Sequence, residues 1–232
     1  MGNDIREAYD LRQFQGASPA VARHIFWGTD ANFDPELTGD KKKLVLEYLH
    51  DGPSFWRLRE VHHPFLVPGY KFGKGRRYHK RFQKLAFKLV DADDVCFADL
   101  CGYSEDAKYD PSKGVPLDHL VNLVKQCFTG GKLNFMPISV LQGFMQHVPQ
   151  VQRHLLLSPV DTEGLLALAS YKLKDSSQIP VYFGKDYAVV RHYHFSCSYF
   201  SDVNAAKLRS VSRKLLSGDL SEAVRKGVLR VF

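Results

Sequence analysis

Short strand-like runs alternate with helix-like segments along most of this 232-residue chain. Strands are expected at residues 24–27, 95–100, 133–136, 155–157, 179–183 and 187–195. Helices are expected over residues 43–49, 54–61, 76–89, 117–128, 139–147, 162–173 and 202–216. Strands separated by helices favour an α/β fold, a three-layer α/β/α sandwich around a mostly parallel central sheet. No repeat or linker divides the chain, so residues 1–232 are expected to form a single domain.

Charge and composition narrow the class of protein. The chain has 32 Lys and Arg against 25 Asp and Glu, a formal net charge of +7, which favours polyanionic partners. Its 44% hydrophobic and 25% charged residues are typical of a globular protein and exclude disorder, collagen and coiled coils. Neither a run of 18 apolar residues nor a signal-peptide core is present, so we expect a cytoplasmic protein without a membrane partner.

The chemistry-bearing residues follow the predicted strands. Thr29, Asp30 and Asn32 come after the first strand, and Asp99 lies at the end of the next. His192, His194 and Ser196 lie at the end of the last. Open parallel sheets bind ligands beyond the carboxyl ends of their strands, so the sequence predicts one functional site from these segments.

In chain order, these segments resemble the motifs of the uracil-DNA glycosylase superfamily. The run Gly28-Thr29-Asp30-Ala31-Asn32-Phe33 looks like a divergent Gly-Gln-Asp-Pro-Tyr-His or Gly-x-Asn-Pro-Gly motif. Phe65-Leu66-Val67-Pro68 is similar to Phe-Ser-Val-Pro, and Asp99 stands where the family has an Asn that reads the base. His194-Phe195-Ser196 matches two positions of His-Pro-Ser. The resemblance spans roughly residues 24–215.

The chain also departs from the family. Ala31 replaces the Pro of the first motif and Phe195 replaces the Pro of the last. The four cysteines, which lack metal-site and disulfide-framework spacing, do not match the iron-sulfur branch of the superfamily either. We therefore expect reduced thiols, no cluster, no cofactor and no metal.

The resemblance implies a monofunctional DNA glycosylase that flips a base from the helix and hydrolyses its N-glycosidic bond. It assigns Asp30 to activating or orienting water and His194 to hydrogen-bonding the departing base. It assigns Phe65 to stacking on the flipped base. Asn32 and Asp99 would complete the base pocket, and the protein would act as a monomer.

Two substitutions within the motifs bear on the choice of base. A carboxylate at Asp99 accepts a hydrogen bond from the amine of cytosine, and a protonated one also donates to the ring nitrogen. Asn32 stands where the family's Tyr excludes groups at C5 of uracil. Cytosine with a hydroxymethyl or glucosylated hydroxymethyl group at C5 is therefore the expected substrate, which implies defence against bacteriophage DNA.

The expected DNA contacts are mostly basic. Residues 71–81 hold six basic side chains in eleven positions, a pattern that favours phosphate binding. Tyr199 and Phe200 would either wedge into the base stack or pack in the core at the start of the last helix. The residues expected to contact DNA are Lys71, Lys74, Arg76, Arg77, Lys80, Ser196 and Tyr199.

Three alternatives remain from the sequence. The first is a uracil or mismatch glycosylase of base-excision repair, and the second is a relative that binds DNA without catalysis. The third is a hydrolytic metal centre, because His192 and His194 point to one face of a strand and His62, His63 and His79 lie elsewhere in the chain.

Overall fold

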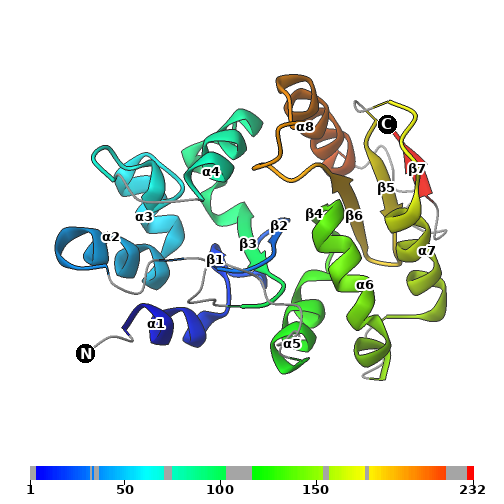
Figure 1. The fold of residues 1–232 in the computed structure, drawn as a ribbon, viewed down its shortest axis with the longest axis horizontal. Coiled ribbons are helices and arrows are strands. Elements are labelled where there is room, and N and C mark those ends of the chain that lie inside the picture. The colour runs from blue at the N-terminus through cyan, green and yellow to red at the C-terminus, as the bar shows by residue number, and fades with distance from the viewer. Residues whose placement is uncertain are drawn as a thin grey trace.

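Seven strands form one mixed sheet in the order β1-β3-β2-β4-β6-β5-β7 (Figure 1). The computed structural model describes residues 4–31, 33, 37–70, 75–102, 117–153, 157–175, 178–217 and 229–232. The strands are β1 (Gln15–Gly16), β2 (His24–Gly28), β3 (Val95–Asp99), β4 (Lys132–Pro137), β5 (Pro180–Phe183), β6 (Tyr187–His192) and β7 (Leu229–Val231). The chain therefore has an α/β fold, as the alternation of segments predicts.

The sheet is parallel in its centre and antiparallel at its edges. Strands β3, β2, β4 and β6 are parallel neighbours. Strand β1 pairs antiparallel with β3, and β5 pairs antiparallel with both β6 and β7. The prediction of a mostly parallel sheet thus holds for the centre only. The loop at 184–186 is too short for a crossover, so β5 and β6 can only form a hairpin.

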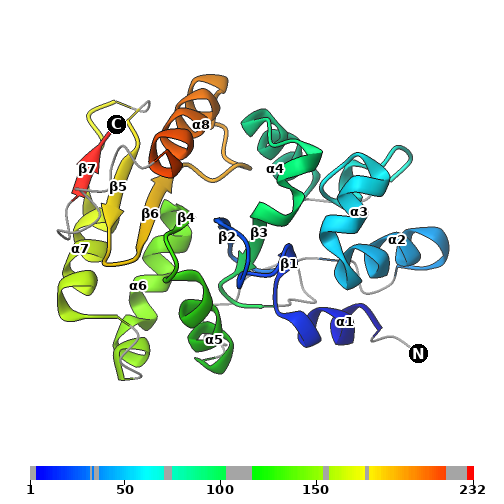
Figure 2. The ribbon, with the colours of Figure 1, turned by 180° about the vertical axis from the view of Figure 1, so that it is seen from behind.

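Helices cover both faces of the sheet (Figures 1 and 2). One face carries α5 (Leu117–Cys127), α6 (Ile138–Arg153) and α7 (Pro159–Ser170). The other carries α4 (Arg76–Phe82) and α8 (Asp202–Leu216). Three helices gather beside the β1 edge of the sheet: α1 (Asp4–Arg12), α2 (Gly39–His50) and α3 (Gly52–Arg59). None of the described helices is long and apolar enough to cross a bilayer.

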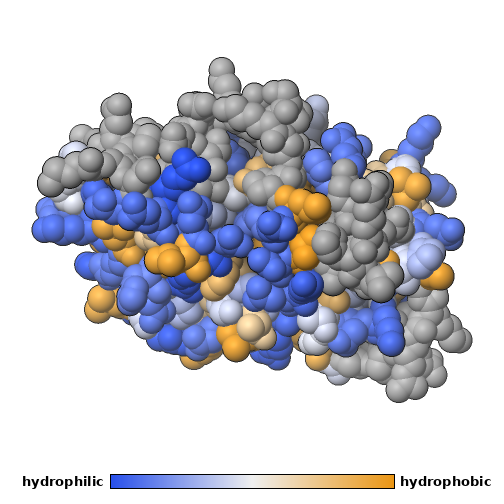
Figure 3. Space-filling model, turned by 90° about the horizontal axis from the view of Figure 1, so that it is seen from below, coloured by the Kyte–Doolittle hydropathy of each residue, from blue (hydrophilic) through white to orange (hydrophobic). Residues whose placement is uncertain are grey.

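Alternate residues of the central strands pack into separate cores. Ile25 and Trp27 of β2 point towards α5, α6 and α7, whereas Phe26 points towards α4 and α8. The Phe26 ring stacks on that of Phe135 with centroids 4.6 Å apart. The central strands are therefore buried on both faces. The surface seen from below differs from these cores, because hydrophilic side chains predominate there and hydrophobic ones are scattered among them (Figure 3).

Several predicted element boundaries are wrong. The helix expected over 76–89 ends at Phe82 and continues only as a 3-10 turn at Gln83–Leu85, because Ala86 adopts a left-handed conformation with φ 56°. A further 3-10 helix, Leu89–Asp94, leads into β3. The strand expected over 187–195 ends at His192, so His194 and Ser196 lie in the following turn. Of the strand expected over 155–157, only Leu157 is described, and it lies in a bend.

Candidate active site

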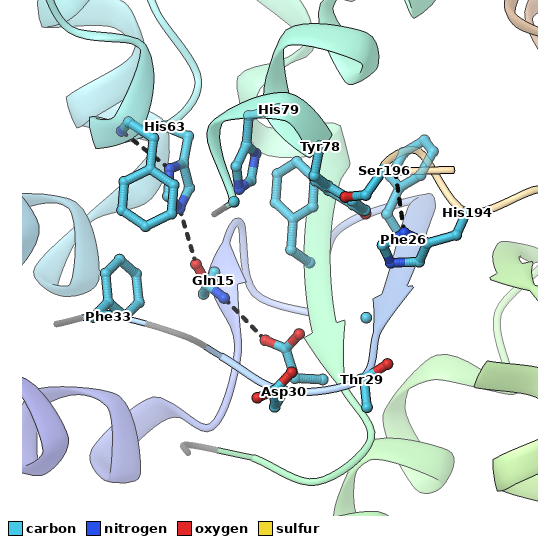
Figure 4. Close-up of a pocket in the computed structure, with 15 residues that line it drawn as sticks. Gln15, Phe26, Thr29, Asp30, Phe33, His63, Tyr78, His79, His194 and Ser196 are labelled. Atoms are coloured by element: carbon cyan, nitrogen blue, oxygen red, sulfur yellow. Dashed lines mark hydrogen bonds between the residues drawn. The ribbon is translucent and has the colours of Figure 1, made fainter. Parts of the chain in front are cut away.

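A pocket of about 230 Å³ lies at the carboxyl ends of β2 and β3 (Figure 4). Five of the predicted site residues line it: Asp30, Phe65, Asp99, His194 and Ser196. The other lining residues are Gln15, Phe26, Gly28, Thr29, Phe33, His63, Gly75, Tyr78, His79 and Phe97. Segments separated by up to about 180 residues of sequence thus meet at one edge of the sheet, as expected for parallel strands.

Backbone hydrogen bonds fix the loop that carries Asp30. Thr29 accepts a hydrogen bond from the Cys101 amide at 2.8 Å, and the Ala31 amide donates to Gly102 at 2.8 Å. Gly102 has a φ of +72°, which a residue with a side chain rarely adopts. Asp30 itself is half-buried and lies between these two anchored residues. The loop therefore holds its carboxylate in a defined position at the pocket wall.

Asp99 is the most buried carboxyl group of the pocket. It is 5% exposed, and its Oδ2 accepts from Gln15 Nε2 at 2.9 Å and from the Tyr9 hydroxyl at 3.4 Å. Burial, and secondarily the nearby Asp30 carboxylate, raise the pKa of Asp99 to about 7, although the two hydrogen bonds oppose the rise. Because both donors bind Oδ2, a proton on Asp99 belongs on Oδ1. Asp99 therefore exchanges a proton near neutral pH.

A chain of hydrogen bonds links Asp99 to His63 (Figure 4). The Phe65 amide donates to His63 Nδ1 at 3.3 Å, so the ring proton lies on Nε2 and is donated to Gln15 Oε1 at 3.3 Å. Gln15 consequently turns its amide nitrogen to Asp99. Gln15 and His63 thus orient Asp99. No sequence pattern marks Gln15, since β1 is only two residues long.

His194 presents a hydrogen-bond donor to the pocket. Its Nδ1 accepts from the Ser196 amide at 3.1 Å, which leaves the ring proton on Nε2. Burial lowers the pKa of His194, so the neutral ring predominates at pH 7. His194 can therefore donate to a ligand oxygen without carrying a charge.

Aromatic rings form the walls of the pocket. Phe65 is 3% exposed and packs against His63 and Phe33, with ring centroids 4.4 and 5.7 Å away. A Cβ on Gly75 would lie 2.5 Å from the Phe65 ring, so only glycine fits there. Phe65 thus serves as packing and as lining at once. Tyr78, half-buried on α4, adds a second ring, 5.4 Å from the ring of His194; the sequence places it only within the basic stretch and not in the base pocket.

The residues predicted to contact DNA differ in how the structure places them. Lys71 and Lys74, like Asn32 of the predicted base pocket, lie outside the described residues. Arg77 and Lys80 are exposed on α4, while Arg76 donates to the Tyr70 carbonyl at 2.8 Å. Tyr199 is 71% exposed, whereas Phe200 is 3% exposed and packs on Phe195. The prediction of Phe200 as a wedge is therefore wrong, because its ring belongs to the core.

The histidines of the metal alternative are engaged with one another. His62 Nε2 lies 3.1 Å from His79 Nδ1, and the rings of His63 and His79 stack with centroids 3.6 Å apart. His192 uses its Nδ1 to donate to the Tyr193 carbonyl at 2.7 Å. Within the described ranges, no three His, Cys, Asp or Glu side chains gather in a way that suits a metal ion. Nothing in that part of the chain favours the metal centre.

Buried His62 makes the fold sensitive to acid. Burial lowers the pKa of His62 to about 3, so the native state keeps it neutral while the unfolded chain protonates below about 6.5. The unfolded state then binds more protons, and stability falls as the pH drops. Replacing His62 by Phe is expected to reduce the loss of unfolding free energy between pH 6.5 and 5.0 by about 1.6 kcal/mol. Urea unfolding of both proteins at the two pH values measures this, and equal losses would contradict it.

Arg81 holds the turn that carries His194. Its Nη1 donates to the Phe195 carbonyl at 2.8 Å and also to the Cys197 carbonyl. Arg81→Met frees the turn, and misplacement by about 1 Å can cost about 100-fold in rate, so we expect a 10- to 100-fold lower rate for the base hydrolysis that the sequence resemblance implies. Arg81→Lys should restore part of the rate. The control Lys84→Met removes only an exposed ion pair with Asp202. Similar losses in both Met variants would refute a positioning role.

No family model, curated protein or solved structure matches this chain. Its function is therefore inferred from the chemistry of the pocket.

Proposed function

We propose that this protein is a DNA glycosylase that binds an extruded base in the pocket and hydrolyses its N-glycosidic bond. The observation that carries the proposal is the meeting of Asp30, Asp99 and His194 in one aromatic-walled pocket at the carboxyl edge of the sheet. Asp30 is a half-buried carboxyl group, Asp99 is a buried one, and His194 is a neutral hydrogen-bond donor. Such a set suits a reaction that separates positive from negative charge.

The size and walls of the pocket suit the heterocycle of one base, so a glucosyl group on C5 would extend beyond the pocket. Its volume of about 230 Å³ is below the ~300–1,000 Å³ of pockets for drug-sized ligands. Tyr78 is half-buried and offers a ring surface, with the buried Phe65 beside it in the lining, and stacking of a base on an aromatic side chain contributes about 1–3 kcal/mol. A flipped base would use this surface together with hydrogen bonds to its polar edge.

Each polar group has a role in the proposed reaction. As the bond to the base breaks, positive charge develops on the sugar, and the Asp30 carboxylate stabilises it and takes a proton from the attacking water. The His194 Nε2–H donates to the base oxygen as negative charge develops there. Asp99, with its pKa near 7, donates its Oδ1 proton to the departing base.

Asp99 also supports the choice of base. Cytosine carries an acceptor at its ring nitrogen, to which a protonated carboxyl donates, and an amine, from which an ionised carboxyl accepts. The sequence at Asn32 supports a cytosine modified at C5, since Asn is smaller than the Tyr at the corresponding position of the uracil-DNA glycosylase motif. We therefore propose cytosine with a hydroxymethyl or glucosylated C5 group as the substrate, and modified bacteriophage DNA as its source.

A panel of oligonucleotides tests the proposal. Purified protein is incubated with single- and double-stranded DNA bearing uracil, cytosine, hydroxymethylcytosine or glucosylated hydroxymethylcytosine, and alkali reveals abasic sites. Release of the modified cytosines supports the proposal. Release of uracil alone would refute the assigned substrate, and binding without release of any base would refute the enzyme assignment.

The exposed cations of α4 are expected to contact phosphates. Replacing both Arg77 and Lys80 by Ala should weaken binding to all sequences and reduce the slope of log affinity against log salt by about 2. The matched control removes Lys41 and Lys43, which are exposed on α2. Fluorescence anisotropy over a salt series measures the slope, and equal slopes in the two double variants would contradict this contact surface.

A further inference from the structure

A second cavity of about 300 Å³ lies between the sheet, α8 and the segment Leu85–Asp94. It adjoins the start of β2, whereas the base pocket adjoins the end of the same strand. Its inner wall is aromatic, formed by Phe26, Phe135, Phe87 and His24. The His24 ring lies edge-on to Phe87 with centroids 4.9 Å apart and stacks on Phe135 at 6.1 Å. Phe87 is half-buried and offers its ring to a planar ligand, whereas Phe26, Phe135 and His24 are at most 4% exposed.

The charged residues around this cavity leave positive charge in excess. Of its two carboxylates, Asp94 is paired with Arg23, whose Nε donates at 2.9 Å, and Asp91 accepts from the Lys88 amide at 2.7 Å. Arg209 and Arg213 lie one turn apart on α8 and also line the cavity. In the described part of the chain, neither arginine forms an ion pair. Two neighbouring guanidinium groups favour a carboxylate, sulfonate or phosphate.

The cavity is also lined by one polar, uncharged pair, His24 and Ser212. His24 is 4% exposed, and its Nε2 lies 2.8 Å from Ser212 Oγ. Burial lowers the pKa of His24 to about 4, so its ring is neutral at pH 7. The excess positive charge therefore resides on α8 and Lys88, at one side of an aromatic surface.

We propose that this cavity binds a small molecule that joins an aromatic ring to one anionic group. The ring packs against Phe87, and the anion binds Arg209 and Arg213. Phe26 lines both this cavity and the base pocket, so the two cavities are neighbours, but each would bind its own ligand. The site is independent of the proposed glycosylase reaction.

The aromatic sulfonate 1-anilinonaphthalene-8-sulfonate is a suitable probe because it combines a ring system with a single anion. Titration followed by its fluorescence should show one saturable site on the folded protein. Replacing Arg209 and Arg213 by Met keeps the apolar stems and removes the charge, and should weaken binding at least about tenfold. The matched single variants are Arg213→Met and Lys214→Met, because Lys214 is the next residue of α8 and does not line the cavity. Only the first should weaken binding.

An uncharged probe separates the contribution of charge from that of the rings. N-phenyl-1-naphthylamine lacks the sulfonate and should bind the wild type and the double Met variant equally, which also shows that the cavity is intact in the variant. Asp30→Asn should leave sulfonate binding unchanged, whether or not it alters base release. Non-saturable binding, or equal sulfonate affinity in the wild type and the double variant, would overturn the proposal.

Discussion

Asp30→Asn is expected to slow release of the base by about 10³-fold while DNA affinity changes less than about threefold. The side chain keeps its size, and the loop keeps its hydrogen bonds to Cys101 and Gly102, because these bonds involve backbone atoms only. The variant loses the negative charge that stabilises the sugar and the basic oxygen that takes a proton from water. General-base and electrostatic contributions of this kind are worth about 10²–10⁴-fold and about 3–4 kcal/mol.

Single-turnover cleavage with excess enzyme measures the rate for Asp30→Asn, and anisotropy measures its DNA affinity. Asp40→Asn, which alters an almost fully exposed carboxylate on α2, is the matched control and should behave as the wild type does. If Asp30→Asn retained more than about a tenth of the wild-type rate, Asp30 would not be the group that activates water. If it lost binding as well, Asp30 would serve the loop rather than the reaction.

The sequence was sufficient to predict which strand ends build the pocket. Asp30 and His194 follow strands of the parallel centre and Asp99 ends another, and parallel strands bring their carboxyl ends to one edge of a sheet. Hydrophobic runs located those strands, because a strand buried on both faces is apolar throughout. The sequence alone therefore predicts that residues from these three distant segments share one site.

The residues that orient the site could not be predicted in the same way. Gln15 lies in a two-residue strand, which is too short to produce a pattern, and it reaches Asp99 only because β1 pairs with β3. His63 and Tyr78 belong to a turn and a short helix whose positions depend on packing with α2 and the sheet. Tyr199 and Phe200 show the same limit: two adjacent aromatic residues suit a wedge or the core equally in sequence, and only packing exposes Tyr199 and buries Phe200.

Asp99→Asn is expected to change the base that the enzyme releases. Asn cannot donate a proton to the departing base, so release of modified cytosine should fall by about 10²-fold or more. The amide does offer both a donor and an acceptor, which suits the edge of uracil. Gln15 and Tyr9 still donate to a side-chain oxygen at the same place, so the site keeps its form. The same oligonucleotide panel should therefore show uracil release in this variant.

The pH dependence of the rate tests whether Asp99 donates a proton to the base or only contacts it. Because the pKa of Asp99 is about 7, the wild-type rate on modified cytosine should fall tenfold per unit as the pH rises above that value. In Asp99→Asn the rate should not depend on pH in this range. Tyr9→Phe removes a hydrogen bond that lowers the pKa of Asp99, so it should move the decline to higher pH. A wild-type rate that is flat from pH 6 to 9, or the same decline in all three proteins, would show that Asp99 does not donate the proton.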